Sequence, residues 1–211
     1  MEIIETGKGT TYTIEINADG IQEFLQIIKQ PLFNEEGSVT GIVGLINNVT
    51  EHELLKKKLR EQAITDALTG LYNRAYLDEF IKTHRDDCYP LAIISADCDG
   101  LKEINDTYGH TAGDEYIKAA VSLFKMVLPQ ECILFRMGGD EFLVLLPSAS
   151  EEKTLLIIDQ LKDKQKQFSI QNRPLSLSFG VSVMNSRADS FHMCITDSDR
   201  NMYFEKRKKR R

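Results

Sequence analysis

Two glycines followed by two acids, set between two apolar runs, limit how this chain can fold more than any other feature. The four residues are Gly138, Gly139, Asp140 and Glu141. The flanking runs, residues 131–135 and 142–146, suit two buried strands, and the glycines suit a tight turn that residues with a Cβ disfavour. Such a hairpin could let a nucleotide lie against the backbone while the acids hold a divalent cation. For this short motif alone, a polar turn without a binding role remains the alternative.

Composition excludes several classes of protein. With 211 residues, 42% of them hydrophobic, the chain can bury one core and a small second module. No stretch approaches the roughly 18 apolar residues of a membrane span, and the N-terminus lacks a secretory pattern, so we expect a cytoplasmic protein without a membrane segment. The four cysteines lack metal-ligand or redox spacing, which argues against disulfides and zinc.

The net charge of −6 argues against a general nucleic-acid binder. Residues 206–211 nevertheless form a strongly basic run against that acidic background. Such a run is usually a solvated helix surface.

The N-terminal part differs in pattern from the rest of the chain. Residues 1–50 alternate like strands, with breaks near Gly20 and Gly37, which predicts a three-stranded meander. Residues 51–64 favour helix, with Leu55 and Leu59 on one stripe, so we expect a connecting helix.

From residue 65 onward helical and extended patterns alternate. We predict helices near 74–83, 113–128 and 151–167, strands at 91–96 and 175–184, the hairpin at 131–146, and a last helix through 203. This order predicts a fold that mixes α and β structure. Because the central pair is a hairpin, the sheet is expected to be mixed or antiparallel.

A second acidic segment follows the predicted strand 91–96. That strand delivers Asp97 at its end, and if it neighbours the hairpin, Asp97 and Asp140 would need a cation between them. Mg²⁺ fits such an all-oxygen site. Lys102 could meet a phosphate, whereas Asp99 is interpreted as the N-cap of a short helix.

Asn105 and Asp114 lie nine residues apart in a polar, glycine-containing stretch. An amide and a carboxylate together could read guanine, which offers the O6 acceptor and the N1–H and N2–H donors. In isolation, a turn role for Asn105 and a helix-cap role for Asp114 are the alternatives. His110 is interpreted as structural, because no partner ligand stands at metal spacing.

Four segments in this order resemble the GGDEF family of diguanylate cyclases. They are residues 66–74, 97–114, 136–142 and 202–206. The resemblance covers residues 65–211 and implies a palm-like α/β domain that condenses two GTP into cyclic di-GMP with Mg²⁺ or Mn²⁺. It also implies activity only as a homodimer, because each domain binds one GTP.

The resemblance assigns roles to individual residues. It implies metal ligands at Asp97, the carbonyl of Cys98 and Asp140, with Glu141 a further ligand or the group that activates the attacking hydroxyl. It implies guanine contacts at Asn105 and Asp114, close nucleotide approach at Gly138 and Gly139, and phosphate contacts at Lys102, Lys206 and Arg210. Residues 129–132 lack the charged inhibitory motif of many members, so we predict no product inhibition there. A catalytically silent GTP-binding module is the alternative function.

Residues 31–51 are similar to the last strands and exit of a PAS sensor domain. Only the C-terminal half of such a domain is present, which suggests either a truncated chain or a reduced sheet whose edge pairs with another copy. Residues 51–64 resemble the helix that couples an upstream sensor to the cyclase, although a plain linker is equally compatible.

Overall fold

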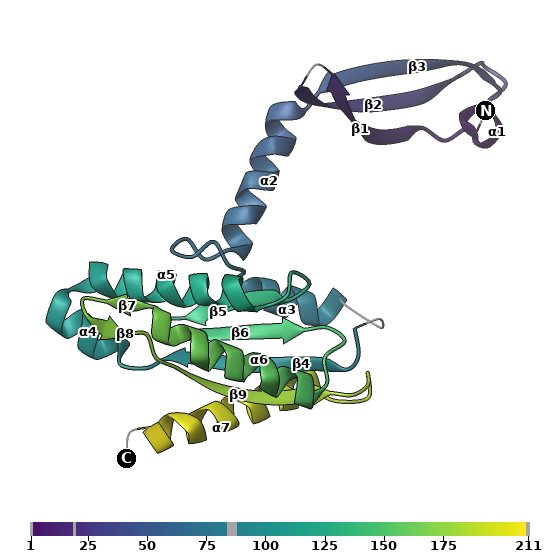
Figure 1. Cartoon of the computed structure of the whole chain (residues 1–211). Coiled ribbons are helices and arrows are strands. Elements are labelled where there is room, and N and C mark those ends of the chain that lie inside the picture. The colour runs from purple at the N-terminus through teal and green to yellow at the C-terminus, as the bar shows by residue number, and fades with distance from the viewer. Residues whose placement is uncertain (1, 19, 84–87, 210–211) are drawn as a thin grey trace. The chain divides into compact units, whose positions relative to one another are not determined.

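The computed structural model describes residues 2–18, 20–83 and 88–209 (Figure 1). The chain divides into two compact units, Met1–Glu61 and Gln62–Arg211. Within the described ranges, no helix combines the length and apolar character that crossing a bilayer requires.

The N-terminal unit is a three-stranded antiparallel sheet, as the alternating pattern predicted. Its elements are α1 (Glu2–Thr6), β1 (Thr10–Ala18), β2 (Ile21–Phe33), β3 (Val39–Asn48) and the start of α2 (Thr50–Ile64). The strands pair in the order β1-β2-β3. Both turns contain a glycine with positive φ, Gly20 at 78° and Gly37 at 80°, a conformation that side chains disfavour. Thr50 fixes the start of α2, because its Oγ1 accepts a hydrogen bond of 2.8 Å from the backbone N–H of Phe24.

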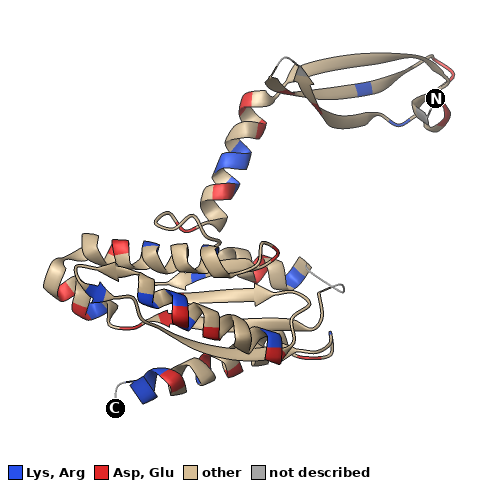
Figure 2. Cartoon of the chain, viewed as in Figure 1, with Lys and Arg blue, Asp and Glu red and all other residues tan. Residues whose placement is uncertain are grey.

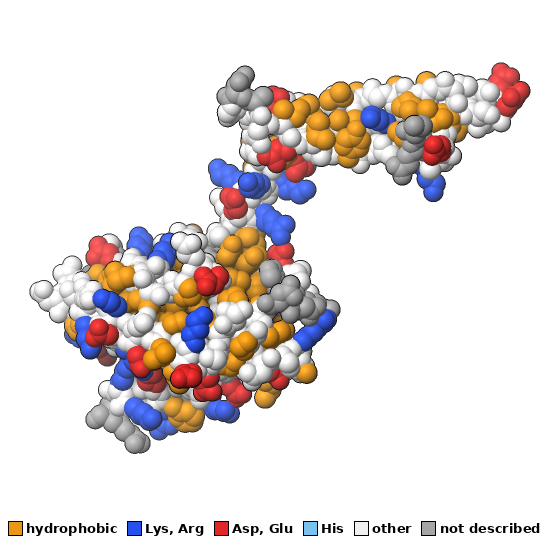
Figure 3. Space-filling view, turned by 45° about the vertical axis from the view of Figure 1, so that its right-hand side comes forward, with side chains coloured by type: hydrophobic (Ala, Val, Ile, Leu, Met, Phe, Trp, Pro, Cys, Tyr) orange, Lys and Arg blue, Asp and Glu red, His pale blue; other side chains and the backbone are white. Residues whose placement is uncertain are grey.

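Apolar side chains of this sheet remain exposed. Among the described residues before Gln62, only Ile3 is buried. One face of the sheet carries Tyr12 opposite Ile27, and Ile27 opposite Ile46, whose side chain is 64% exposed. Figure 3 shows apolar side chains gathered along the unit. Within the described part of this unit, the three strands therefore form a single-layer sheet.

The C-terminal unit contains a four-stranded sheet flanked by helices. Its elements are α3 (Arg74–Thr83), β4 (Leu91–Cys98), α4 (Leu101–Tyr108), α5 (His110–Val127), β5 (Ile133–Gly138), β6 (Glu141–Leu146), α6 (Glu151–Lys164), the 3₁₀ turn η1 (Gln165–Gln167), β7 (Ser169–Ile170), β8 (Arg173–Pro174), β9 (Leu177–Met184) and α7 (Phe191–Lys209). The strand order is β5-β6-β4-β9, and every neighbouring pair is antiparallel. This confirms the mixed α and β fold predicted from the sequence.

Side chains of the sheet alternate between two apolar cores. Ala92, Ile94 and Cys98 of β4 belong to the core under α4, α5 and α6. Leu91 and Ile93 point the opposite way, into the core that includes residues of α3 and α7. The period of two thus places Asp97 on the α7 face and Cys98 in the α5 core.

Three helices differ from their predicted bounds. α6 ends at Lys164 rather than at residue 167, and the last three residues form η1. α5 begins at His110 rather than near residue 113, because Gly109 with φ of 84° ends α4 and precedes α5 directly. α7 continues past residue 203 to Lys209, since lysine and arginine form helix well and suit its C-terminal end. α7 also crosses β9 closely at Gly180, where an added Cβ would stand 2.1 Å from the carbonyl oxygen of Ser198.

Candidate active site

The glycine pair forms the predicted tight turn between β5 and β6. Gly138 has φ of 146° and Gly139 of 53°, both in the region that favours glycine. The sequence prediction gave no role to Arg136, yet its guanidinium holds this turn. Its Nη2 and Nε donate to the carbonyl oxygen of Gly139 at 2.8 and 3.2 Å. The positive φ angles of the two glycines and the hydrogen bonds from Arg136 therefore together define the shape of the turn.

Arg136 also joins the turn to the start of the unit. Its Nη1 lies 2.9 Å from Oδ1 and 3.1 Å from Oδ2 of Asp66, and only 11% of the Arg136 side chain is exposed. Burial works against the charged form of Asp66, but hydrogen bonds from Thr69 and Arg136 outweigh it and hold the pKa below its usual value. The motif beginning at Asp66 therefore braces the turn.

The antiparallel pairing of β4 and β6 brings the predicted acids together. Asp97 lies opposite Glu141 in the register, and the N–H of Cys98 donates to the carbonyl oxygen of Asp140 at 3.0 Å. Residues directly opposite in a ladder point to the same face, so Asp97 and Glu141 share the α7 side. The structure therefore juxtaposes the two segments as predicted, while their metal-binding roles remain predictions.

Asp97 is buried, with only 6% of the residue exposed, and two other carboxylates lie near it. Burial, followed by the charges of Asp140 and Asp99, raises the pKa of Asp97, and the opposing contribution comes from Lys206. Lys206 extends from α7 and donates a hydrogen bond to Asp97 Oδ1. An ammonium group thus occupies a position at this carboxylate where a bound cation would also be favourable.

The donor atoms at this edge suit a hard cation. Burial raises the pKa of the Cys98 thiol, so its side chain stays neutral in the core and only its carbonyl can serve as a ligand. No group of three or more His, Cys, Asp or Glu side chains in the described ranges is arranged to hold a metal. Mg²⁺ is commonly bound by one or two carboxylates and completed by water and substrate phosphates. The oxygen donors of Asp97, Asp140 and the Cys98 backbone are of the kind that Mg²⁺ or Mn²⁺ binds, and their role as ligands remains a prediction.

The predicted N-cap role of Asp99 is wrong. Gly100, with φ of 76°, occupies the N-cap position of α4, and no side chain caps the helix there. The Asp99 carboxylate instead accepts hydrogen bonds from Ser176 Oγ at 2.7 Å and Ser178 Oγ at 2.8 Å. Lys209 Nζ completes the set at 2.9 Å.

These contacts reverse the effect of burial on Asp99. Burial alone would raise its pKa, but the donors Ser176, Lys209 and Ser178 together lower it. Asp99 therefore stays charged and ties the end of β4 to β9 and α7. Sequence reasoning missed all three donors.

The interpretation of the basic run as solvated surface is wrong for two lysines. Lys206 and Lys209 turn toward the acids, with 18% and 34% of their side chains exposed. Figure 2 shows the basic residues gathered at the end of α7. Arg210, the other predicted phosphate contact in this run, lies outside the described residues.

Asn105 is not a turn residue and Asp114 is not a helix cap, so both alternative interpretations of this predicted guanine-binding pair are wrong. Asn105 lies within α4, and Asp114 lies inside α5, beyond its first turn and exposed. The Asn105 side chain lies against Gly113, the residue directly before Asp114. The two residues predicted to contact guanine therefore lie on two helices that pack against each other. Lys102 and His110 are both exposed, which leaves the phosphate role of Lys102 a prediction.

Two cavities lie near α7. One, of about 330 Å³, includes Asp99, Gly100, Arg173, Lys206 and Lys209 in its lining. The cavity has mixed charge, because Glu103 lines it as well as Asp99 and the three cationic side chains.

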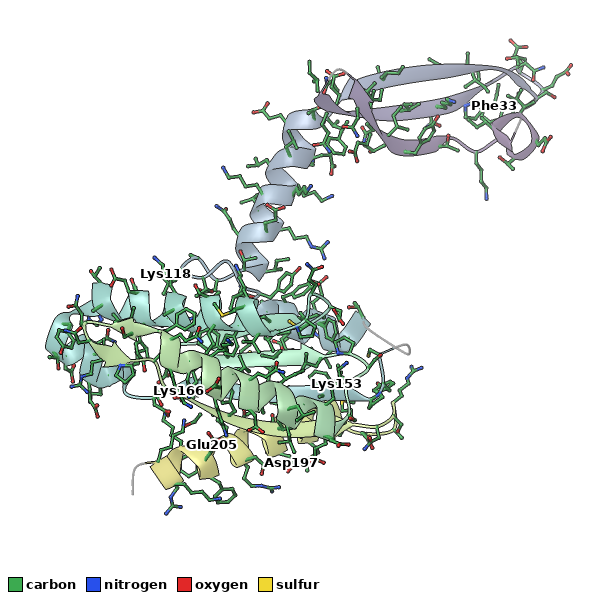
Figure 4. All side chains as sticks on the ribbon, in the orientation of Figure 1. Phe33, Lys118, Lys153, Lys166, Asp197 and Glu205 are labelled. Atoms are coloured by element: carbon green, nitrogen blue, oxygen red, sulfur yellow. The ribbon has the colours of Figure 1, made fainter. Side chains whose placement is uncertain are left out.

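A more open groove of about 1200 Å³ lies between α6 and α7 and does not include Asp97 or Asp140. It is bridged by the pair between Lys162 Nζ and Glu205 Oε2 at 2.9 Å, and Glu205 is labelled in Figure 4.

Comparisons with known proteins identify the class. The family model described as "Diguanylate cyclase, GGDEF domain" matches residues 63–211. The chain therefore belongs to the GGDEF diguanylate cyclase family.

Among curated relatives, diguanylate cyclase DosC of Escherichia coli strain K12 is 31% identical over 210 residues, covering 90% of this chain and 45% of its own length. A diguanylate cyclase of Vibrio cholerae is 30% identical over 198 residues, covering 90% of this chain and 61% of its own length. The chain thus spans less than two thirds of either relative.

Solved structures share the fold. The GGDEF domain of PA1120 (TpbB or YfiN) from Pseudomonas aeruginosa is 33% identical, with a TM-score of 0.60 over 68% of this chain and 89% of its own. The coiled coil and GGDEF domain of DgcB from Caulobacter crescentus, solved with c-di-GMP, gives a TM-score of 0.65 over 74% of this chain and 89% of its own. At 23% identity the DgcB match supports the fold alone.

Proposed function

We propose that this chain is a diguanylate cyclase that condenses two GTP into cyclic di-GMP and releases two pyrophosphates. The observation that carries the proposal is the convergence of Asp97, Asp140 and Glu141 at one sheet edge, beside a glycine turn and two inward lysines. Phosphoryl-type transfer needs alignment and charge neutralisation more than covalent help from the protein, and this edge offers both.

Each residue has a defined task in this proposal. Asp97, the Cys98 carbonyl and Asp140 would hold Mg²⁺ or Mn²⁺, and Gly138 with Gly139 would let the nucleotide approach the backbone. The chemistry that the bound ion supplies is polarisation of the α-phosphate and a lowered pKa of the attacking 3′-hydroxyl. Glu141, exposed on the same face as Asp97, would accept the proton of that hydroxyl.

The remaining residues would bind the substrate, and one of them would change its ion-pair partner. Asn105 and Asp114 would read guanine, while Lys102, Lys206 and Arg210 would contact phosphates. Lys206 would exchange its contact with Asp97 for one with the triphosphate, so that the acid becomes free for the cation.

Ring closure requires two copies of the catalytic domain. The 3′-oxygen of one GTP attacks the α-phosphorus of the other, the bond to pyrophosphate breaks, and the same exchange then occurs in the opposite direction. A homodimer with a two-fold axis presents two such nucleotides to each other. The N-terminal sheet and α2 would be part of a PAS-like sensor and its signalling helix, and they would orient the two copies. We place the reaction in the cytoplasm, where GTP is available.

The direct test is incubation of the full chain with GTP and Mg²⁺ over a range of protein concentrations. We expect cyclic di-GMP and pyrophosphate, with a rate that rises more steeply than in proportion to protein. Asp140→Ala should lower the rate at least about a hundredfold. Asp163→Ala is the matched control, because this acid lies on α6 with 71% of its side chain exposed. Nucleotide binding without product at high protein concentration would instead indicate a silent GTP-binding module.

A further inference from the structure

Gly113 stands in an unusual place for a glycine, inside α5 and buried. Alanine is the better helix former, and Gly113 is not among the glycines with positive φ. Backbone freedom therefore does not explain the residue. The residue is explained by the lack of room for a side chain, because a Cβ at this position would stand 1.9 Å from Oδ1 of Asn105 and 2.8 Å from its Cγ.

The Asn105 amide is held with its oxygen turned inward. Oδ1 is buried and has no hydrogen-bond partner among the described residues. A buried acceptor without a partner costs free energy, so this orientation needs a cause. The oxygen lies where the Cβ of any other residue would be and faces the Cα hydrogen of Gly113, which is a weak donor. The amide nitrogen is then the polar group of Asn105 that a ligand can reach.

We propose that Gly113 is a positioning residue for guanine recognition. It leaves the space that seats Asn105 Oδ1 between α4 and α5, so that the amide presents its N–H donors to an acceptor of the base. Asp114, the next residue, presents its carboxylate to the N1–H and N2–H donors. This inference rests on the proposed function, in which GTP is the substrate, and it gives Asn105 the role of donor.

A methyl group at position 113 should act through Asn105. Gly113→Ala would force the amide to rotate away, and the base would lose one hydrogen bond. Such a loss weakens binding about two- to tenfold. Because the reacting atoms are untouched, we expect a higher KM for GTP with kcat nearly unchanged.

The test is a double-mutant cycle on the full chain with Gly113→Ala, Asn105→Ala and the double variant. Affinity is measured with 3′-deoxy-GTP and Mg²⁺, because this analogue lacks the attacking hydroxyl. Either single variant should weaken binding about two- to tenfold, and the double variant no further. Lys118→Ala is the matched control, since this exposed side chain, labelled in Figure 4, lies on the same helix.

Thermal unfolding tests the packing of the Asn105 amide against Gly113, which we call the seat, independently of any nucleotide. In the Asn105→Ala chain, Gly113→Ala should raise the Tm by about 2–4 °C, because the clash is gone and the helix propensity remains. In the natural chain the same change should leave the Tm unchanged or lower it.

Three results would decide against the proposal or part of it. An equal loss of affinity from Gly113→Ala with and without Asn105 would overturn it. A Tm shift of the same sign in both backgrounds would overturn the seating of the amide. If the natural chain does not bind 3′-deoxy-GTP, the guanine role and the proposed function fail together, while the Tm measurements still judge the seat alone.

Discussion

The two units of this chain place their apolar side chains differently. In the C-terminal unit both faces of the sheet are covered by helices, and residues such as Phe124 and Leu145 are fully buried. In the N-terminal unit the three strands pair along most of their length, but only Ile3 is buried among the described residues. Backbone pairing can therefore define a sheet without giving it a core. Burial of apolar area, which dominates folding stability, distinguishes the two.

The largest expected effect comes from removing a core side chain. Phe124→Ala should lower the free energy of unfolding of the C-terminal unit by about 3–5 kcal/mol, because the ring is fully buried against Phe142 at 5.3 Å between centroids. Ile46→Ala in the N-terminal sheet should change stability by no more than about 0.5 kcal/mol, since that side chain is 64% exposed. Urea unfolding followed by circular dichroism measures both. A large cost for Ile46→Ala would mean that its face of the sheet is covered in solution.

A smaller effect is expected from removing the ion pair between Arg136 and Asp66 beside the glycine turn. Arg136→Ala should cost about 2 kcal/mol, because it leaves the partly buried Asp66 carboxylate without its positively charged partner. It should also reduce the proposed cyclase activity, because the carbonyl of Gly139 loses its hydrogen bonds. Lys56→Ala, which removes a 70% exposed side chain paired with Glu53 on α2, should change stability by less than about 0.5 kcal/mol. Equal effects of the two variants would contradict the bracing role of Arg136.

The smallest effect is a difference in pH dependence. The pKa of Asp66 is lowered in the fold, so its stabilising contribution is complete above the ordinary Asp value of about 4 and is lost as the pH falls. Urea midpoints of the natural chain should therefore fall more between about pH 5 and 3 than those of Asp66→Asn. Glu15, whose pKa is lowered by hydrogen bonds from Gln22 and Asn17, lies on the exposed sheet. Because Glu15 is exposed to solvent, its contribution is screened, and Glu15→Gln should flatten the pH profile less than Asp66→Asn does. A flattening equal to that of Asp66→Asn would refute the contrast.

The sequence was most informative where local pattern and chemistry agree. The glycine turn, the strand ending at Asp97 and the meander of residues 1–50 followed from local periodicity and turn chemistry. That the strand ending at Asp97 neighbours the hairpin was assumed from the sequence, and the pairing of β4 with β6 confirmed it, with Asp97 opposite Glu141.

Long-range partners were not predictable in the same way. Ser176 lies 77 residues from Asp99, and Lys209 lies 110 residues from it. Local preference made Asp99 a helix cap, and only the tertiary fold supplied the competing donors. Gly113 was noted only as part of a polar stretch, because its reason is the proximity of Asn105 on another helix.

The link between Cys98 N–H and the Asp140 carbonyl has one more consequence. The spacing of the acidic segments is inherited from a backbone ladder, whose strands in any sheet lie about 4.8 Å apart whatever their side chains. Substitutions elsewhere in the chain can therefore accumulate without changing the spacing of these acidic segments.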